Sequence, residues 1–200
     1  MNQNEAIEFL RDKNQNDERR ENLCLKCGRC CKVALPSSPQ DELKRKADEG
    51  DLEATSFLNV FEPYESLDAA KKADEDYVNL IIENIKNNEG FDESKLIFYK
   101  CKHLADNNAC QIYETRPDCC RRCPENGWFI LPAECGFQGW QFEQREHNKK
   151  VIRGLKELLY ELSFYKEEEV VTSDGQTAKE LINKIEAKIE PWRKYGADLW

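Results

Sequence analysis

The sequence predicts a mainly α-helical protein with a small cysteine-rich centre made of loops and one β-hairpin. Apolar residues recur at helical spacing over most of the chain. The cysteines, in contrast, all fall between Cys24 and Cys135, mostly in dense groups. The best strand candidate, Leu96 to Tyr99, leads directly into Cys101. Together these observations favour helices that flank a compact cysteine-rich centre.

The length of 200 residues suits one domain. We expect residues 22–136 to form a cysteine-cluster core, residues 37–90 a helical insertion within it, and residues 137–200 a helical extension. The net charge of -9 gives no general attraction to nucleic acid or to an anionic membrane. No apolar run approaches the roughly 20 residues of a membrane helix. Because Met1 to Ala6 show no basic region and no apolar stretch follows, we expect no signal peptide and a cytoplasmic protein.

Four helices are expected before the strand, and the first covers residues 4–21. Ser37 and Pro39 mark the start of the second, where serine supplies the cap and proline occupies the first turn. Gly50 ends that helix. A short helix follows over residues 52–60. The fourth covers residues 68–88, where apolar residues recur at helical spacing, namely Tyr77, Leu80, Ile81, Ile82 and Ile85.

A short hairpin and two helices complete the predicted elements. Residues 106–108 form the expected turn and residues 110–113 return beside the strand, which places Cys101 and Cys110 close together. The pattern is helical again from Gln138 to about Glu168, and a last helix runs from about Thr177 to Ile189 and ends at Pro191. The aromatic residues that follow, Trp192, Tyr195 and Trp200, are expected to cover the core.

Four cysteines lie within the eight residues from Cys24 to Cys31, with the spacing C-x-x-C-x-x-C-C. Core packing does not require such a group, because a buried cysteine behaves as a small hydrophobe that other residues can replace. Gly28 fits a backbone that curls back after C-x-x-C, since glycine accepts a positive φ at little steric cost. The segment therefore predicts one half of a metal site.

A second set of cysteines follows from Cys101 to Cys135. In a reducing cytosol, clustered cysteines more often bind metal or do redox work than form disulfides. Thiolates favour zinc, copper(I) or iron–sulfur clusters, although neither set has the ferredoxin spacing. The candidate metal ligands are all ten cysteines: Cys24, Cys27, Cys30, Cys31, Cys101, Cys110, Cys119, Cys120, Cys123 and Cys135.

Adjacent cysteines occur twice, as Cys30 with Cys31 and as Cys119 with Cys120. Successive side chains usually diverge, so both thiols of such a pair rarely bind one ion. We therefore expect either more than one metal centre or a cluster with a bridging thiolate. Eight to ten thiols also suit two four-coordinate sites.

The order of the motifs resembles the CxxCxxCC family, the YkgJ-type cysteine-cluster group of zinc- or iron-chelating proteins. The resemblance spans about residues 24 to 136. It rests on the octet with Gly28, on Cys101-x-His103-Leu104, on Cys110-x-Ile112-Tyr113-Glu114-x-Arg116-Pro117 and on Cys120-Arg121. It implies eight ligands, namely Cys24, Cys27, Cys30, Cys31, Cys101, Cys110, Cys120 and Cys135. Cys119 and Cys123 are additional, and Cys123 stands where the family usually has an aromatic residue before proline.

Three classes of function remain open. The first is a protein that chelates zinc or iron, with an iron–sulfur or multinuclear centre among the forms considered. The second is an iron-dependent redox or protein-modifying enzyme, because some members of the resembled family are flagellin lysine N-methylases and others are iron–sulfur oxidoreductases. Those methylases are longer, and this sequence has no glycine-rich methyl-donor fingerprint. The third is a metal-stabilised module that binds a protein partner through Trp192 and Trp200.

Several polar residues accompany the second set of cysteines. We expect His103 to be a polar residue of the hairpin turn, with metal ligation as the alternative, because thiols are already in surplus. Arg116 and Arg121 would offset the negative charge of thiolate-bound metal, with ordinary solvation as the alternative. Tyr113 is expected to pack, and Pro117 to fix the turn into Cys120.

Overall fold

The computed structural model of the chain describes residues 21–88, 90–193 and 195–199. The expected helix over residues 4–21 falls almost entirely outside the described residues, and Trp200 also lies outside them. The described part of the chain divides into two compact units, one that ends at residue 138 and one that begins at residue 139. The single-domain organisation stays a prediction. Every helix in the described part of the chain is too short or too polar to cross a membrane.

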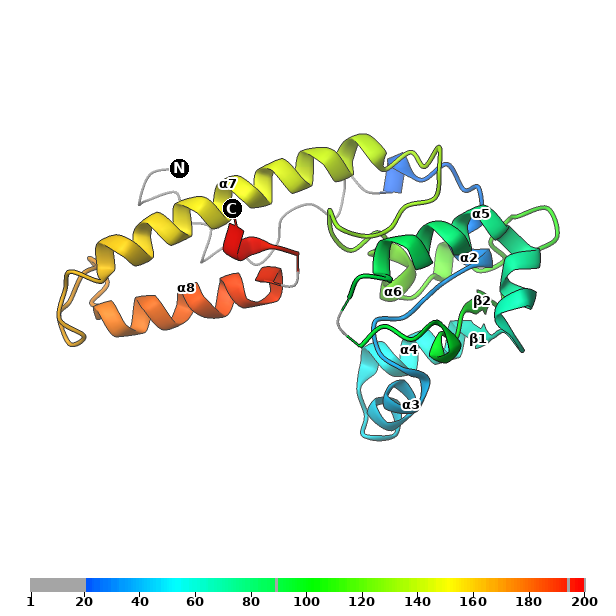
Figure 1. The fold of residues 1–200 in the computed structure, drawn as a ribbon, viewed down its shortest axis with the longest axis horizontal. Helices are drawn as coiled ribbons and strands as arrows, with labels where there is room; N and C mark the ends of the chain where they lie inside the picture. The colour runs from blue at the N-terminus through cyan, green and yellow to red at the C-terminus, as the bar shows by residue number, and fades with distance from the viewer. Residues whose placement is uncertain (1–20, 89, 194, 200) are drawn as a thin grey trace. The chain divides into compact units, whose positions relative to one another are not determined.

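The predicted fold class is confirmed, because the chain is mainly helical with one small two-stranded sheet. The unit that carries the cysteines contains short helices and two short strands (Figure 1). In chain order they are η1 (Glu21–Leu23), α2 (Arg29–Lys32), α3 (Gln40–Asp48), α4 (Leu52–Val60), β1 (Phe61–Pro63), α5 (Leu67–Ile85), η2 (Glu93–Lys95), β2 (Tyr99–Cys101), η3 (Tyr113–Thr115) and α6 (Asp118–Arg121).

The strand before Cys101 exists, but its bounds and its partner differ from the prediction. It begins at Tyr99 and pairs antiparallel with β1, with Phe61 opposite Cys101. Aromatic packing accounts for this pairing, since the Phe57 ring stacks on Phe61 at 4.7 Å and meets Tyr99 edge-on at 5.2 Å. The predicted return over residues 110–113 is reduced to an isolated bridge between Leu104 and Cys110. The turn still brings Cys110 back beside the strand that contains Cys101.

The core of this unit is formed by α5 and by two extended segments, one after the first cysteine group and one before Cys101. Tyr77, Val78 and Ile81 of α5 are buried against Val33 and Phe98. Val33 directly follows the first cysteine group, and Phe98 precedes Cys101 by three residues. Burial of these apolar side chains therefore anchors both cysteine-bearing segments to one helix.

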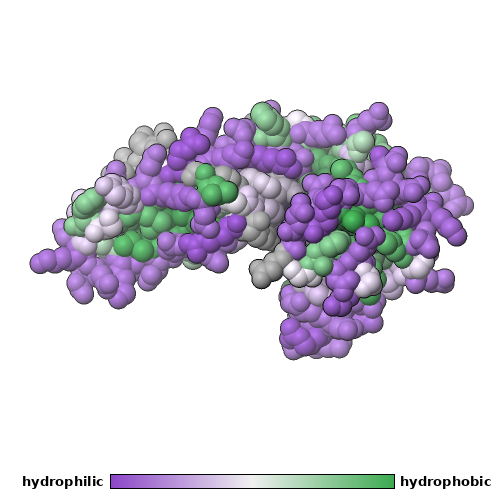
Figure 2. Space-filling model, in the orientation of Figure 1, coloured by the Kyte–Doolittle hydropathy of each residue, from purple (hydrophilic) through white to green (hydrophobic). Residues whose placement is uncertain are grey.

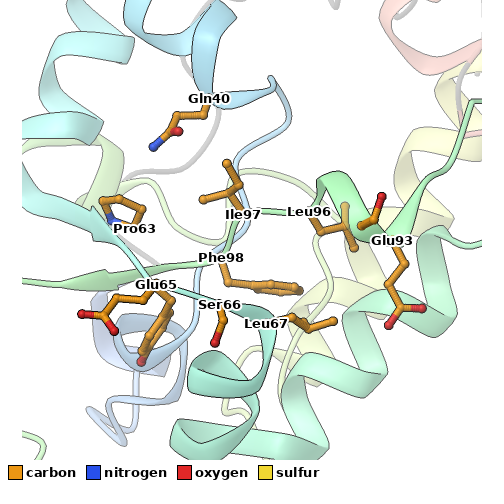
Figure 3. A pocket seen from close by; sticks show the side chains of 11 residues that line it. Gln40, Pro63, Glu65, Ser66, Leu67, Glu93, Leu96, Ile97 and Phe98 are labelled. Carbon is orange, nitrogen blue, oxygen red and sulfur yellow. The ribbon is translucent and has the colours of Figure 1, made fainter.

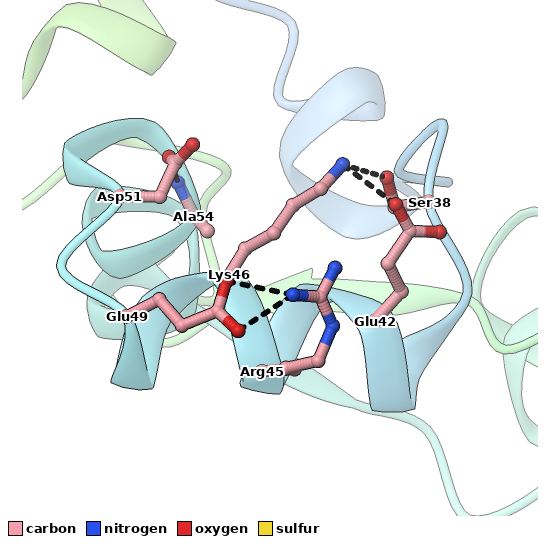
Figure 4. A network of polar contacts seen from close by, with 7 residues as sticks. All are labelled: Ser38, Glu42, Arg45, Lys46, Glu49, Asp51 and Ala54. Carbon is pink, nitrogen blue, oxygen red and sulfur yellow. Dashed lines mark hydrogen bonds and ion pairs between the residues drawn. The ribbon is translucent and has the colours of Figure 1, made fainter.

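Helix α3 begins differently from the sequence-based expectation. Pro39 occupies the N-cap position and no side chain caps the helix, whereas the Ser38 hydroxyl accepts a hydrogen bond from Lys46 Nζ at 3.0 Å. Because Pro39 takes the N-cap position, Ser38 lies one residue outside it, and its hydroxyl binds Lys46 from about two turns further along the helix. The ion pair of Arg45 with Glu49 also lies on this helix (Figure 4). Gly50 ends α3 with a φ of 88°, as predicted.

A shallow pocket of about 750 Å³ opens on the same unit (Figure 3). Residues from the start of α3, from the loop before α5 and from the segment before β2 line it. They are Gln40, Pro63, Tyr64, Glu65, Ser66, Leu67, Glu93, Ser94, Leu96, Ile97 and Phe98. None of the ten cysteines belongs to this lining, so the pocket is separate from the candidate metal ligands.

The second unit is a helical hairpin of α7 (Gln138–Leu162) and α8 (Ala178–Arg193), followed by η4 (Ala197–Leu199). The two long helices lie side by side and bury a shared apolar core that includes Leu155, Leu158, Leu181 and Ile185 (Figure 1). Helix α7 ends at Leu162, earlier than predicted. Helix α8 continues past Pro191, because a proline in the last turn removes few helical hydrogen bonds. Trp192 packs against the core, as expected.

The surface of the molecule is predominantly hydrophilic on the face that Figure 2 shows, with smaller hydrophobic patches between the purple areas. This agrees with a chain in which 34% of the residues are charged. Most of the large apolar side chains are instead collected in the separate cores of the two units.

Candidate metal centre

All ten cysteines lie in the first unit and all are free thiols. Cys27 is exposed and the other nine are partly buried. The thiols come from three places: the loop and short helix α2 around Gly28, the turn after β2, and the segment from α6 to Cys135. The backbone conformation beside the cysteines explains how these three segments approach one another.

Gly28 brings the first cysteine group against the turn between Cys101 and Cys110. Its φ of 77° is in the left-handed region, as the C-x-x-C-G pattern predicts. A Cβ atom at this position would lie 2.9 Å from Asn108 Cβ and 3.3 Å from Leu104 Cδ1. Only glycine therefore permits both the backbone curl and the close approach of the turn.

Gly136 makes a second close approach, which the sequence analysis missed. A Cβ atom there would lie 2.1 Å from the backbone oxygen of Leu23. Leu23 precedes Cys24 and Gly136 follows Cys135, so this contact brings the first and last cysteines of the chain together. A glycine directly after a cysteine, as in Cys135-Gly136, is the only sequence signal for it.

Tyr113 connects the first cysteine loop with the segment that leads to α6. Lys26 Nζ lies 4.1 Å from the centre of its ring, and the Arg116 guanidinium carbon lies 3.7 Å from it. The two cations therefore hold the ring by cation–π contacts. This confirms that Tyr113 packs.

Arginine side chains fix the backbone of this segment. Arg116 Nε donates to the carbonyl of Tyr113 at 2.9 Å, and Arg121 Nε donates to the carbonyl of Arg116 at 2.8 Å. Arg121 Nη2 also donates to the carbonyl of Glu114 at 2.7 Å. A hydrogen bond with Cys30 and burial raise the pKa of Cys31, and the positive charge of Arg116 opposes part of this rise. Arg116 thus both shapes the loop and places positive charge beside a thiol.

Helix α6 holds the second adjacent pair. The two sulfur atoms of Cys119 and Cys120 lie 4.0 Å apart, and Ser56 Oγ of α4 lies 3.4 Å from Cys119 Sγ. A hydrogen bond with Cys120 lowers the pKa of Cys119 to about 6, and the same contact raises the pKa of Cys120. The two adjacent thiols therefore resist ionising together.

The remaining interactions divide the thiols into two groups. In the first group, a hydrogen bond with Cys123 raises the pKa of Cys30, burial adds to the rise, and Cys24 contributes further. Burial raises the pKa of Cys135, and Cys27 and Cys24 add to this rise. We call these five thiols, Cys24, Cys27, Cys30, Cys123 and Cys135, group A.

The second group surrounds the turn after β2. Burial raises the pKa of Cys101, with smaller contributions from Cys31 and Cys110. Cys101 and Cys31 also raise the pKa of Cys120. We call these five thiols, Cys31, Cys101, Cys110, Cys119 and Cys120, group B. The adjacent residues Cys30 and Cys31 share a hydrogen bond, and each also influences thiols of a different group.

The donor set fits a soft cation. The charge of one thiolate disfavours ionisation of the thiols around it, and a metal cation would reverse that balance by stabilising the thiolates. Sulfur donors suit zinc and iron, whereas magnesium and calcium prefer oxygen donors. Within the described residues, however, no three Cys, His, Asp or Glu side chains converge closely enough to hold an ion.

His103 contributes backbone groups to this region. Its amide donates to Cys101 Sγ at 3.4 Å, and its carbonyl accepts from Gln111 N at 2.9 Å. Both contacts stabilise the turn that returns to Cys110. They agree with the expectation that His103 is a residue of the turn, while its ligation of metal was the less favoured alternative.

The ion pair between Arg29 and Asp74, next to the first cysteine group, was not predicted. Arg29, between Gly28 and Cys30, donates from Nε and Nη2 to the two carboxylate oxygens of Asp74, both at 2.6 Å. The hydrogen bond from Arg29 lowers the pKa of Asp74. Nearby, the Tyr77 hydroxyl donates to the carbonyl of Ile130 at 2.8 Å. Helix α5 thus contacts the first cysteine group through Arg29 and the segment between Cys123 and Cys135 through Ile130.

A thiol-rich region supported by helices is typical of the cysteine-cluster class of proteins. The sequence comparison agrees with this class. The CxxCxxCC family, described as "Putative zinc- or iron-chelating domain", matches residues 23–150. The match covers more than half of the chain, so the chain belongs to the CxxCxxCC family. No curated protein and no solved structure matches it.

Proposed function

We propose that this protein binds zinc or iron through the thiolates of its clustered cysteines. The observation that carries the proposal is the gathering of ten free thiols from three distant segments into one unit. Two glycines with no room for a side chain, Gly28 and Gly136, support it, because each allows a close approach of the backbone directly beside a cysteine. Core packing alone gives no reason for such an arrangement.

Groups A and B favour two metal centres over one. Each group has five thiols, and a structural zinc takes four ligands. The direct contact of Cys30 with Cys31 would place the two centres side by side or allow a bridging thiolate. All ten cysteines therefore remain candidate ligands, and each group has one thiol more than a four-coordinate ion needs. Rotation of the thiols toward the ion would complete each set.

Binding would require deprotonation of the thiols. A bound zinc or iron ion would supply the positive charge that stabilises neighbouring thiolates. Arg116, beside Cys31, would offset part of the negative charge of group B. Burial of nine of the ten thiols would limit their exchange with solvent.

The test is anaerobic purification of the full chain, with elemental analysis and a visible absorption spectrum on one sample. We expect about two metal ions per chain. A colourless zinc protein would favour structural sites. A brown iron protein with acid-labile sulfide would establish an iron–sulfur centre, and it would favour a redox function over a structural one. Metal-free protein whose ten thiols all react freely would contradict the proposal.

The high cysteine content also bears on the cellular location of the protein. Because clustered cysteines stay reduced, and open to metal, in a reducing compartment, we propose a cytoplasmic location. The acidic chain gives no reason to expect nucleic acid as a partner. Metal ions are the proposed partners, and capture of a protein partner would be tested with the metal-loaded chain.

A further inference from the structure

Asp74 interrupts the long helix α5 at one residue. Its backbone is extended, with φ of -162° and ψ of 84°, while the residues on both sides are helical. Its carboxylate then accepts a hydrogen bond from Tyr77 N at 3.2 Å, as a capping residue does at the start of a new helix. The break in the helix therefore fixes the orientation of the Asp74 carboxylate.

The same carboxylate receives both Arg29 donors in a bidentate ion pair at 2.6 Å. The exposed fraction of the side chain is 26% for Arg29 and 11% for Asp74, so solvent screens the pair only partly. The two residues are 45 positions apart in the chain. The pair thus joins α5, which is anchored in the core, to the short helix α2.

Helix α2 needs such an anchor. It has only four residues, none of them is buried, and no side chain caps its start. Two of those four residues are Cys30, a member of group A, and Cys31, a member of group B. A helix this short has little stability of its own, so contacts with its neighbours determine its orientation.

We propose that Asp74 is a positioning residue for the metal centre: through Arg29 it orients α2 so that Cys30 and Cys31 face their separate groups. The inference rests on the proposed function, since it assigns a role in metal binding to a pair that contains no ligand. Tyr64, whose hydroxyl donates to the Lys32 carbonyl at 2.8 Å, holds the other end of α2. The pair is therefore one of two attachments, and its loss should weaken binding without unfolding the chain.

The test compares zinc affinity of full-length variants by competition with a chromophoric chelator under anaerobic conditions. Asp74→Asn removes the charge of the carboxylate. Arg29→Lys keeps the charge but loses the bidentate fork, and it leaves the Asp74 cap on Tyr77 in place. We expect each variant to bind zinc about 10- to 100-fold more weakly than the parent chain, with an unchanged helical circular dichroism spectrum.

The matched controls are Glu49→Gln and Arg45→Lys, which alter an ion pair of the same 2.6 Å length on the exposed surface of α3 (Figure 4). Both should bind zinc like the parent chain. Parental affinity in both Asp74→Asn and Arg29→Lys would overturn the inference. So would weak binding by Asp74→Asn alone, because the carboxylate would then act only within α5. A parent chain that binds no zinc or iron would instead contradict the proposed function.

Discussion

At the scale of single residues, glycines decide how closely the cysteine-bearing segments approach. Gly28 and Gly50 both have φ in the left-handed region, at 77° and 88°. A Cβ at Gly28 would meet Asn108 at 2.9 Å, whereas a Cβ at Gly50 would meet nothing within 4 Å. A side chain at Gly50 would therefore carry only the conformational cost of a left-handed backbone. A side chain at Gly28 would add the cost of a steric clash with the turn.

Alanine substitution at these two glycines should show this difference. Gly50→Ala should cost about 1–2 kcal/mol for the left-handed backbone alone. Gly28→Ala should cost about 1–3 kcal/mol more, because the turn at Asn108 must move. Urea unfolding of both variants measures the difference in the free energy of unfolding. Equal costs would mean that the turn yields without penalty.

A second pair of glycines tests the contact between Cys24 and Cys135. Gly136→Ala would force the Leu23 carbonyl away from its present position, 2.1 Å from the new Cβ, and should lower the metal content of the purified protein. Gly139→Ala, three residues later in α7, meets nothing within 4 Å and should be neutral or slightly stabilising. Elemental analysis of both proteins provides the comparison. Full metal loading of Gly136→Ala would exclude a role for this contact.

Asp74 gives the free energy of unfolding a defined pH dependence. Arg29 lowers its folded-state pKa, with small help from Lys32, so the pair stabilises the fold above the unfolded-state pKa near 3.8. This stabilisation is lost as the pH falls through the lower, folded-state value. With a chelator present, the stability difference between the parent chain and Asp74→Asn should be constant above about pH 5 and shrink below about pH 4. A difference that stays constant to low pH would contradict the ion pair.

At the scale of elements, the long helices and the cysteine segments depend on different forces. Helices α7 and α8 bury an apolar core of their own, with Leu155 and Ile185 fully buried. The segments around residues 23–32 and 101–136 contain short helices and turns with few buried residues. Metal binding would therefore supply much of the stability of those segments.

Hydrogen exchange with and without a chelator measures this difference. We expect amides in residues 23–32 and 101–136 to exchange faster after metal removal, while amides in α7 and α8 keep their protection. The two long helices serve as the internal control in the same sample. Unchanged exchange in the cysteine segments would show that their fold does not depend on metal.

The elements also show what the sequence reveals and what it does not. Helices such as α4 and α5 were predictable because apolar residues repeat along them. The pairing of β2 with β1 was not, since β1 has three residues and includes Pro63, which gives no alternation to recognise. The octet from Cys24 to Cys31 suggested one half of a metal site, and its ligands stay a prediction. The Arg29–Asp74 pair joins residues far apart in the chain, and no local pattern marks such a contact.

At the scale of the whole molecule, two units with separate cores carry different chemistry. The unit that ends at residue 138 holds all ten cysteines, and the hairpin of α7 and α8 holds none. The family match extends from residue 23 to residue 150, so the last part of the hairpin lies beyond it. The hairpin core is thus separate from the candidate ligands, both in sequence and in packing.

This separation predicts that a core defect in the hairpin leaves metal binding intact. Leu155→Ala removes a fully buried side chain and should destabilise the hairpin by about 2–5 kcal/mol. Leu199→Ala makes the same change at a side chain that is 91% exposed, and it should have little effect. Thermal unfolding gives the stability of each variant, and elemental analysis gives its metal content. We expect Leu155→Ala to unfold at a lower temperature with parental metal content, because its lost contacts lie within α7, α8 and η4. Loss of metal in step with the hairpin would show that the two units fold as one, and it would then support the single-domain organisation expected from the sequence.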